Sequence, residues 1–391
     1  MASFCEIVVH DNVERLEPLF CEESRPKERL VRAFATIERF KSRLDEASAA
    51  RFEVAKAVLH DGFAVLVSQQ FFGLFDPVRT VAASRWQFGE FRRADVEGRA
   101  RRRLEEFAAL VPWDGSDGSI VQPARLEFAL FPADPANREA MVDRFGLDGC
   151  ACSPGMIRVE LWPSEGNLAR FEALLARLFV LQLRWANWRE PGREELAPAA
   201  SGTAAVSWSP TLADHLAAQG LASNFVAALF PELPTTAWLA PFRPFGPSGS
   251  AEEPGTWEAE LARVAMLLGV ANYSELVTNH FGRGPIVGTA RPAAIAPRDG
   301  EERDYARVLL TPLLAATDPC TIAAALYGDE LVSAQGHAPL GLATYAGLEW
   351  AHERVKQTLA ARRKSRASGA IGVSGVMAAI AAPSAELVGG S

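Results

Sequence analysis

One stretch of the chain limits the possible folds more than any other, because it reads as a helix that is apolar on nearly every side. It runs from Phe171 to Arg189 with the sequence FEALLARLFVLQLRWANWR, so other parts of the protein have to cover most of its surface. Arginines nevertheless stand at Arg170, Arg177 and Arg184, seven residues apart and therefore close to one stripe of the helix. Because a buried guanidinium needs partners, the stripe predicts either an internal polar network or a binding site.

The segments around this helix indicate that it packs against a small sheet. Residues 124–134 (ARLEFALFPAD) and 155–163 (GMIRVELWP) alternate apolar and polar side chains near prolines, as strands do. Residues 210–232 predict a second apolar helix or a pair of helices. Two strands followed by two helices favour an α+β domain with helices against a sheet.

The pattern of the whole chain divides it into three parts. Residues 1–110 are expected to form a helical N-terminal region, because apolar residues recur there at steps of three and four. Residues 111–360 hold the α+β domain. Residues 361–391 begin with a basic cluster and continue with small and apolar residues, which predicts a linker and a flexible tail. A partner-docking peptide, a segment folded back into the chain's own cleft and a peptide-precursor core are the alternatives for residues 369–391.

Composition excludes several classes of function. A net charge of −8 argues against a nucleic-acid partner. No uncharged apolar run reaches the roughly 18 residues that a membrane span requires, so we expect no membrane-spanning helix. Cys150 and Cys152 lack the C-x-x-C spacing and the second pair of typical metal sites, and they predict two reduced thiols. The first residues lack a signal-peptide pattern, so we expect a cytoplasmic protein. The sequence leaves the oligomeric state open.

The order of motifs between about Pro112 and Gln357 resembles the DUF2268 family of predicted zinc-dependent, zincin-type proteases. FPADPAN at Phe131–Asn137 is similar to the family's FPADP-N segment, and LDGCACSPGMIRVELWP is similar to its glycine-rich segment and following strand. The resemblance implies a zincin-like fold, in which the edge strand of a small sheet receives an extended peptide. Two helices flank the cleft of that fold.

Both of those helices have counterparts in this chain. The family's active-site helix reads L-P-A-L-x-x-H-E-x-H-H-x-x-R, and FEALLARLFVLQLR matches its frame without a gap. The family's second helix, roughly T-L-x-x-x-L-x-x-E-G-L-A-x-x-F, is matched by TLADHLAAQGLASNFVAALFPE. Further on, ALYGDE and APLGLATYAGLEW resemble the family's glycine- and aromatic-rich segment weakly.

The resemblance also places the catalytic positions, and none of them holds a catalytic residue. A zincin needs two histidines one helical turn apart, a glutamate beside the first histidine and a third ligand. The histidines fall on Arg177 and Leu181, the glutamate on Leu178 and the third ligand on Gln219. Arginine stays protonated, leucine has no lone pair, and glutamine is a weak neutral ligand. We therefore expect that zinc has been lost and that the protein has no cofactor.

The remaining histidines offer little. His215 lies one turn before Gln219 and is a candidate for the same site, although a packed histidine at the helix surface or core is the simpler interpretation. His352 and Glu353 begin AHERVK, which we interpret as a solvated helix face. No G-x-S-x-G, phosphate-binding loop or dinucleotide-binding motif is present.

Arg177 is therefore the central residue of the predicted site. Gln219 can accept one of its hydrogen bonds, Asp214 or Glu172 can supply a carboxylate, and a ligand carboxylate is a further option. The alternatives are that Arg177 reaches the surface or closes an internal ion pair.

The leading functional hypothesis is a non-catalytic, metallopeptidase-like protein that binds a peptide or protein segment along the former active-site cleft. The alternatives are a divergent metal-dependent peptidase or other hydrolase, and a carrier for its own C-terminal peptide.

Overall fold

The computed structural model describes about half of the chain. The described residues are 5–20, 81–111, 125–133, 146–153, 155–187, 210–233, 262–267, 300–329, 338–342, 345–365 and 372–388, with residues 120, 135, 141 and 336.

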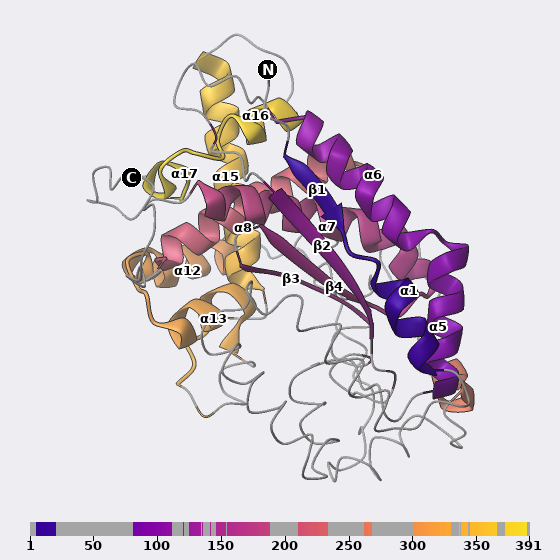
Figure 1. The fold of residues 1–391 in the computed structure, drawn as a ribbon. Coiled ribbons are helices and arrows are strands. Elements are labelled where there is room, and N and C mark those ends of the chain that lie inside the picture. The colour runs from indigo at the N-terminus through magenta and orange to yellow at the C-terminus, as the bar shows by residue number, and fades with distance from the viewer. Residues whose placement is uncertain are drawn as a thin grey trace, which may run out of the picture.

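These residues form a mixed α+β structure that is mostly helical and contains one four-stranded sheet (Figure 1). The strands are β1 (Glu6–Val9), β2 (Arg125–Pro132), β3 (Leu147–Ser153) and β4 (Met156–Leu161). The helices are α1 (Asn12–Leu16), α5 (Val81–Arg93), α6 (Val96–Ala109), α7 (Glu165–Ala186), α8 (Leu212–Leu229), α12 (Gly300–Leu310), α13 (Pro319–Tyr327), α15 (Ala346–Ser365), α16 (Val373–Met377) and α17 (Ser384–Val388), with short 3-10 turns at Glu17–Phe20 and Thr311–Leu313.

The sheet has the strand order β1-β2-β4-β3. β1 and β4 run parallel to β2, whereas the edge strand β3 runs antiparallel to β4. Both strands predicted from alternation are confirmed as β2 and β4, and they pair in the register Phe128↔Ile157 and Leu130↔Val159. These four side chains are all buried, which explains why the pattern was readable in the sequence.

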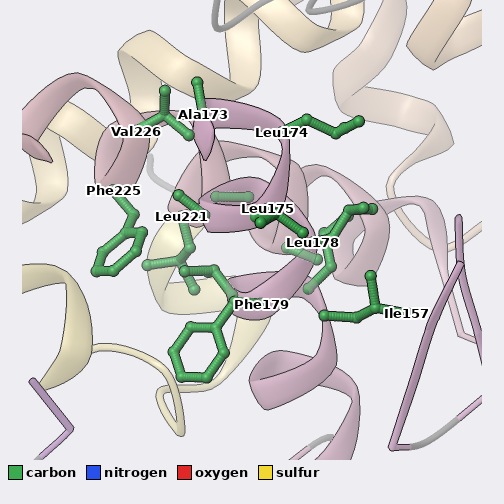
Figure 2. Packing of buried hydrophobic residues seen from close by; sticks show 14 of the residues in the cluster. Ile157, Ala173, Leu174, Leu175, Leu178, Phe179, Leu221, Phe225 and Val226 are labelled. Carbon is green, nitrogen blue, oxygen red and sulfur yellow. The ribbon is translucent and has the colours of Figure 1, made fainter. Parts of the chain in front are cut away.

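The sheet and three long helices follow one another in layers. α7 packs on β3 and β4, α8 packs on α7, and α15 packs on α8 (Figure 1). Figure 2 shows Leu178 of α7 on the side of Ile157 in the sheet, and Phe179 on the side of Phe225 in α8. The apolar character of α7 on nearly every side therefore has a simple cause, because a sheet covers one face and a helix covers the other.

Local signals set the ends of the two central helices. The Ser164 side chain accepts a hydrogen bond from Asn167 N and caps α7, which begins six residues earlier than the apolar run alone suggests. The predicted second helix is one helix, α8. Its capping box joins Thr211 and Asp214, each of which binds the other's backbone N–H.

α8 is covered by α7 on one side and α15 on the other, and Gly220 permits the close approach of α15. A Cβ atom at Gly220 would lie 2.5 Å from both the Ala351 carbonyl oxygen and Val355 Cγ2. Only a glycine fits at this crossing without movement of one helix.

The N-terminal part of the chain differs from the helical region that the sequence predicts. α5 and α6 are helices as expected, but β1 is a strand of the central sheet, and α6 packs on both β1 and α7. Four residues are too few for a readable alternation, and their pairing with β2 depends on a partner more than 100 positions away. Residues 21–80 lie outside the described part.

The C-terminal part also differs from the expected linker and flexible tail. α15 continues to Ser365, beyond the predicted boundary at residue 360, and residues 372–388 are folded. We call these residues the 372–388 segment. Its apolar side chains are at most 2% exposed at Val376, Met377, Ile380, Leu387 and Val388. None of the helices in the described ranges has both the length and the apolar character to cross a membrane.

Candidate functional site

The structure brings together two residues that the sequence comparison with the DUF2268 family singles out. Arg177 lies in the middle of α7 and Gln219 in the first half of α8, 42 positions further along the chain. Arg177 Nη2 donates a hydrogen bond of 2.5 Å to Gln219 Oε1. Both side chains are buried, with 5% and 9% exposed. The guanidinium therefore lies between the two central helices and does not reach the surface.

Two tyrosines act on Arg177 electrostatically. Burial lowers the pKa of Arg177, whereas the electrostatic effects of Tyr327 and Tyr345 raise it. Tyr327 ends α13 in the ALYGDE segment, and Tyr345 precedes α15 in the LATYAGLEW segment. We call Arg177, Gln219, Tyr327 and Tyr345 the arginine site. The sequence pointed to both segments as aromatic motifs, but it gave no sign that their tyrosines face α7.

The backbone holds the two tyrosines together. Tyr345 N donates to the Tyr327 carbonyl oxygen at 3.1 Å, and the two rings meet edge to face with centroids 6.4 Å apart. Tyr345 has a left-handed backbone with φ of 62°, which is unfavourable for a bulky residue. Such strained residues concentrate at functional sites, where the surrounding structure holds them.

Leu178 and Leu181 belong to the core. Leu178 is 2% exposed and faces the edge strand β3, where a Cβ atom at Gly149 would lie 2.6 Å from Leu178 Cδ1. Leu181 is 7% exposed and belongs to the same hydrophobic cluster. Leu178 therefore lies beside the edge strand β3.

His215 lies near the arginine site but contacts a different residue of α7. Its ring meets Trp185 edge to face, with centroids 5.1 Å apart. Burial is the main effect on the imidazole and lowers its pKa, with a smaller opposing effect of Asp214. His215 is thus a packed histidine, the simpler of the two interpretations from the sequence.

The other two arginines of the stripe serve different purposes. Arg170 bonds within its own helix, with Nη2 donating to Asn167 Oδ1 at 2.9 Å and Nε donating to Gly166 O at 3.1 Å. Arg184 reaches out of α7 to the 372–388 segment, where it donates to the carbonyl oxygens of Ile380 and Ala382. The stripe is therefore an internal polar network with three separate sets of partners.

The two carboxylates expected near Arg177 bind elsewhere. Glu172 accepts hydrogen bonds from Arg99 and Arg103 of α6, and these hydrogen bonds and charges lower its pKa in spite of the opposing effect of burial. Asp214 caps α8 and accepts a hydrogen bond from Ser384 Oγ.

The interpretation of His352 as part of a solvated face is wrong. His352 is 2% exposed, its Nδ1 lies 3.0 Å from Ser223 Oγ, and burial lowers its pKa to about 4. Lys356 and Glu353 do form an ion pair on the more open side of α15. His10 pairs with Glu127 of β2 at 2.7 Å. His60, His280 and His337 lie outside the described residues.

The chemistry of the arginine site suits anion or carbonyl recognition better than metal binding. Arginine offers five N–H donors and no acceptor, and the phenol groups can donate or accept. The leucines at the second-histidine and glutamate positions offer no ligand atom, so these side chains do not fit a zinc ion. In the described part of the chain, no group of three or more histidine, cysteine, aspartate or glutamate side chains is placed to hold a metal.

Comparison of the chain with family models, with curated proteins and with solved structures found no match.

Proposed function

We propose that this chain is a zincin-like protein of the DUF2268 type that has lost its zinc site and acts by binding a peptide or protein segment. One observation carries the proposal. The hydrogen bond between Arg177 and Gln219 joins the two positions onto which the family resemblance places the first and third zinc ligands. Zinc ligands have to meet within a few ångströms, so contact between these two side chains is what the assignment requires, and this contact supports the proposal.

Other contacts agree with this assignment. The helix that carries Arg177 packs on β3, an antiparallel edge strand, and Leu178 at the glutamate position faces that strand. The aromatic segments that resemble the family near its C-terminus supply Tyr327 and Tyr345, which are near enough to Arg177 to raise its pKa electrostatically. Gln219 and the two tyrosine segments, which all contribute to the resemblance, therefore act on one guanidinium.

Peptide binding is the function that such a site supports best. Arg177 is buried and bonded to Gln219, so a bound segment would reach its guanidinium by displacing the Gln219 side chain. The guanidinium and phenol groups are then donors suited to the carbonyl and carboxylate groups that every peptide carries. The unpaired side of an edge strand can accept an extended segment through main-chain hydrogen bonds. Catalysis of hydrolysis in the zincin manner would need a base beside the metal, and Leu178 cannot serve as one.

Restoring the ligands tests the register directly. The variant Arg177→His, Leu181→His and Gln219→Glu should bind zinc at a ratio near one per chain, measured by elemental analysis after dialysis. A matched control keeps Leu181 and carries only the other two substitutions, and it should retain far less zinc. If the folded triple variant binds no more zinc than this control, the assignment of these positions is wrong. Stoichiometric zinc together with chelator-sensitive peptide cleavage in the unaltered protein would favour the peptidase alternative.

A selection of random displayed peptides tests the binding function. Peptides enriched on the unaltered protein should lose binding to Arg177→Met and keep binding to Arg102→Met. Arg102 is a suitable control because it lies on α6 and forms an exposed ion pair with Asp95. Equal loss or equal retention in both variants would contradict a role of the arginine site.

A further inference from the structure

The 372–388 segment is attached to the rest of the structure in an unusual way. In the described part of the chain, its backbone-to-backbone hydrogen bonds run between its own residues, for example from Ile380 N to Met377 O at 3.1 Å and from Glu386 N to Pro383 O at 3.0 Å. It adds no strand to the sheet and continues no long helix. Its departure would therefore leave the backbone hydrogen bonds of the other elements intact.

Polar side chains of three long helices hold the segment instead. Arg184 of α7 donates from Nη1 to the carbonyl oxygens of Ile380 at 2.6 Å and of Ala382 at 2.7 Å, and from Nη2 to Ser384 Oγ at 2.6 Å. One guanidinium thus binds two backbone groups and a hydroxyl within five residues.

Asp214 of α8 completes this contact. Ser384 Oγ accepts from Arg184 and donates to Asp214 Oδ1 at 2.5 Å, so the hydroxyl bridges a cation and an anion that belong to different helices. The partner that fits between them has to offer both a donor and an acceptor on one atom, as serine or threonine does. Asp214 Oδ2 meanwhile accepts from the Thr211 backbone and side chain, which fixes the carboxylate in place.

Apolar contacts supply the rest of the attachment. α16 packs on α8 and α15, and α17 packs on the same two helices (Figure 1). Six apolar side chains of the segment, Ala379 among them, are almost fully buried, whereas Ser374 and Ala385 are exposed. On the α15 side, Thr358 Oγ1 donates to the Leu387 carbonyl oxygen at 3.2 Å, and Arg362 pairs with Glu386.

We propose that Arg184 and Asp214 form a peptide-binding site, distinct from the arginine site, whose ligand is the chain's own 372–388 segment. Three kinds of contact made by the segment are those by which proteins bind peptides. A side-chain donor binds backbone carbonyls, apolar side chains pack between helices, and a fixed pair of charges binds a hydroxyl. The segment is thus a built-in ligand made mostly of small and apolar residues, whose Ser384 is held by Arg184 and Asp214, and it can leave without disrupting the sheet, α7, α8 or α15. This inference does not depend on the proposed function.

The test separates the ligand from its site in the full-length protein. A protease-recognition sequence is inserted within residues 366–371, and the folded protein is cut there. The segment should stay bound after cleavage, as seen by native mass spectrometry. An excess of fluorescent peptide corresponding to residues 372–388 should then replace it, as seen by fluorescence anisotropy.

Variants of the competing peptide identify the contacts. Ser384→Ala in the peptide should weaken competition about tenfold or more, since it removes hydrogen bonds to two charged groups. Ser374→Ala should compete like the unaltered peptide, because Ser374 is exposed on the same segment. Equal competition by both peptides would refute the role of Arg184 and Asp214.

Several further outcomes would overturn the proposal. Loss of near-UV circular dichroism after cleavage, or failure of the added peptide to exchange while the protein stays folded, would make the segment a permanent part of the core. A dimer of the uncut protein that becomes monomeric on cleavage would place the segment on a second copy. In the uncut protein, Arg184→Met should speed amide hydrogen exchange selectively in residues 372–388, and a uniform change or none would count against the proposal.

Discussion

The two faces of α8 both bury polar side chains, but the partners of these side chains differ in charge. Toward α7, Gln219 accepts a hydrogen bond from Arg177, a group that stays charged across the accessible pH range. Toward α15, Ser223 meets the neutral imidazole of His352, and Asn224 Nδ2 donates to the His352 carbonyl oxygen at 3.0 Å. The hydrogen bond to α7 therefore involves a permanent charge, whereas the contact with α15 involves a titratable group. An acid titration should weaken the α15 face through His352 more than the α7 face, where His215 is the titratable group.

The largest effect on stability is expected from a substitution that adds a side chain where α8 and α15 approach each other closely. Gly220→Ala places a Cβ atom 2.5 Å from a backbone oxygen of α15, so one helix has to move, and we expect a loss of about 3 kcal/mol in unfolding free energy. Gly89→Ala is the matched control, since no atom lies within 4 Å of a Cβ there. It should be neutral or stabilise α5 by up to about 1 kcal/mol. Urea denaturation measures both, and similar values for the two variants would contradict the close approach.

The pH dependence of stability should report His352. Its pKa is about 4 in the folded protein and near 6.5 when unfolded, so the unfolded state binds the proton first. The stabilisation is complete above pH 6.5 and declines as the pH falls, by about 2 kcal/mol at pH 5 and about 3 kcal/mol at pH 4. His352→Asn should remove this part of the slope in urea titrations between pH 4 and 7. An unchanged slope in that variant would assign the acid sensitivity to other groups.

Removing the hydrogen bond between Arg177 and Gln219 should lower the unfolding free energy by less than the two changes above. This loss should not depend on pH between 4 and 7. Gln219→Leu removes the acceptor for Arg177 Nη2, and we expect a loss of about 1–2 kcal/mol. Gln219→Glu keeps an acceptor at the same position and serves as the control in the same urea experiment. If Gln219→Leu is as stable as the unaltered protein, the hydrogen bond contributes nothing and the comparison between the two faces fails.

The smallest effect is expected at His215. Burial lowers its pKa, so protonation opposes folding there as well, but His215 is less buried than His352. His215→Leu should change stability at pH 7 by less than about 1 kcal/mol and should flatten the acid slope slightly. If His215→Leu flattens the dependence of stability on pH more than His352→Asn does, the α7 face and not the α15 face contains the main titratable group.

The sequence predicted those parts of the fold whose pattern is local. β2 and β4 carry an apolar–polar alternation that was readable although both strands are buried along most of their length, and α7 and α8 are long apolar runs with caps in front of them. The strand β1 was missed because four residues carry almost no periodicity. The 372–388 segment was mistaken for a flexible tail because small residues look unable to form a core, whereas Arg184 of a distant helix supplies its attachment.

The candidate site likewise contains one contact that the sequence predicted and others that depend on residues far apart in the chain. Gln219 was expected as a partner of Arg177, and the structure shows this contact. Tyr327 and Tyr345 were not singled out, because only the packing of α13 and α15 on α8 brings them near α7. His352 was misread because the charges of Glu353 and Lys356 drew attention to one side of α15, while the buried line of Leu348, His352, Val355 and Leu359 faces the other elements.

The position of α8 between two helices has a consequence for synthesis on the ribosome. Asn224 and its partner His352 are 128 positions apart, which corresponds to roughly 6–25 s of translation. During that interval α8 has left the ribosome while the helix that covers its second face does not yet exist. An apolar helix exposed for so long is a natural ligand for chaperones and a natural starting point for aggregation. Conditions that slow translation between residues 224 and 352 should therefore lower the yield of folded protein.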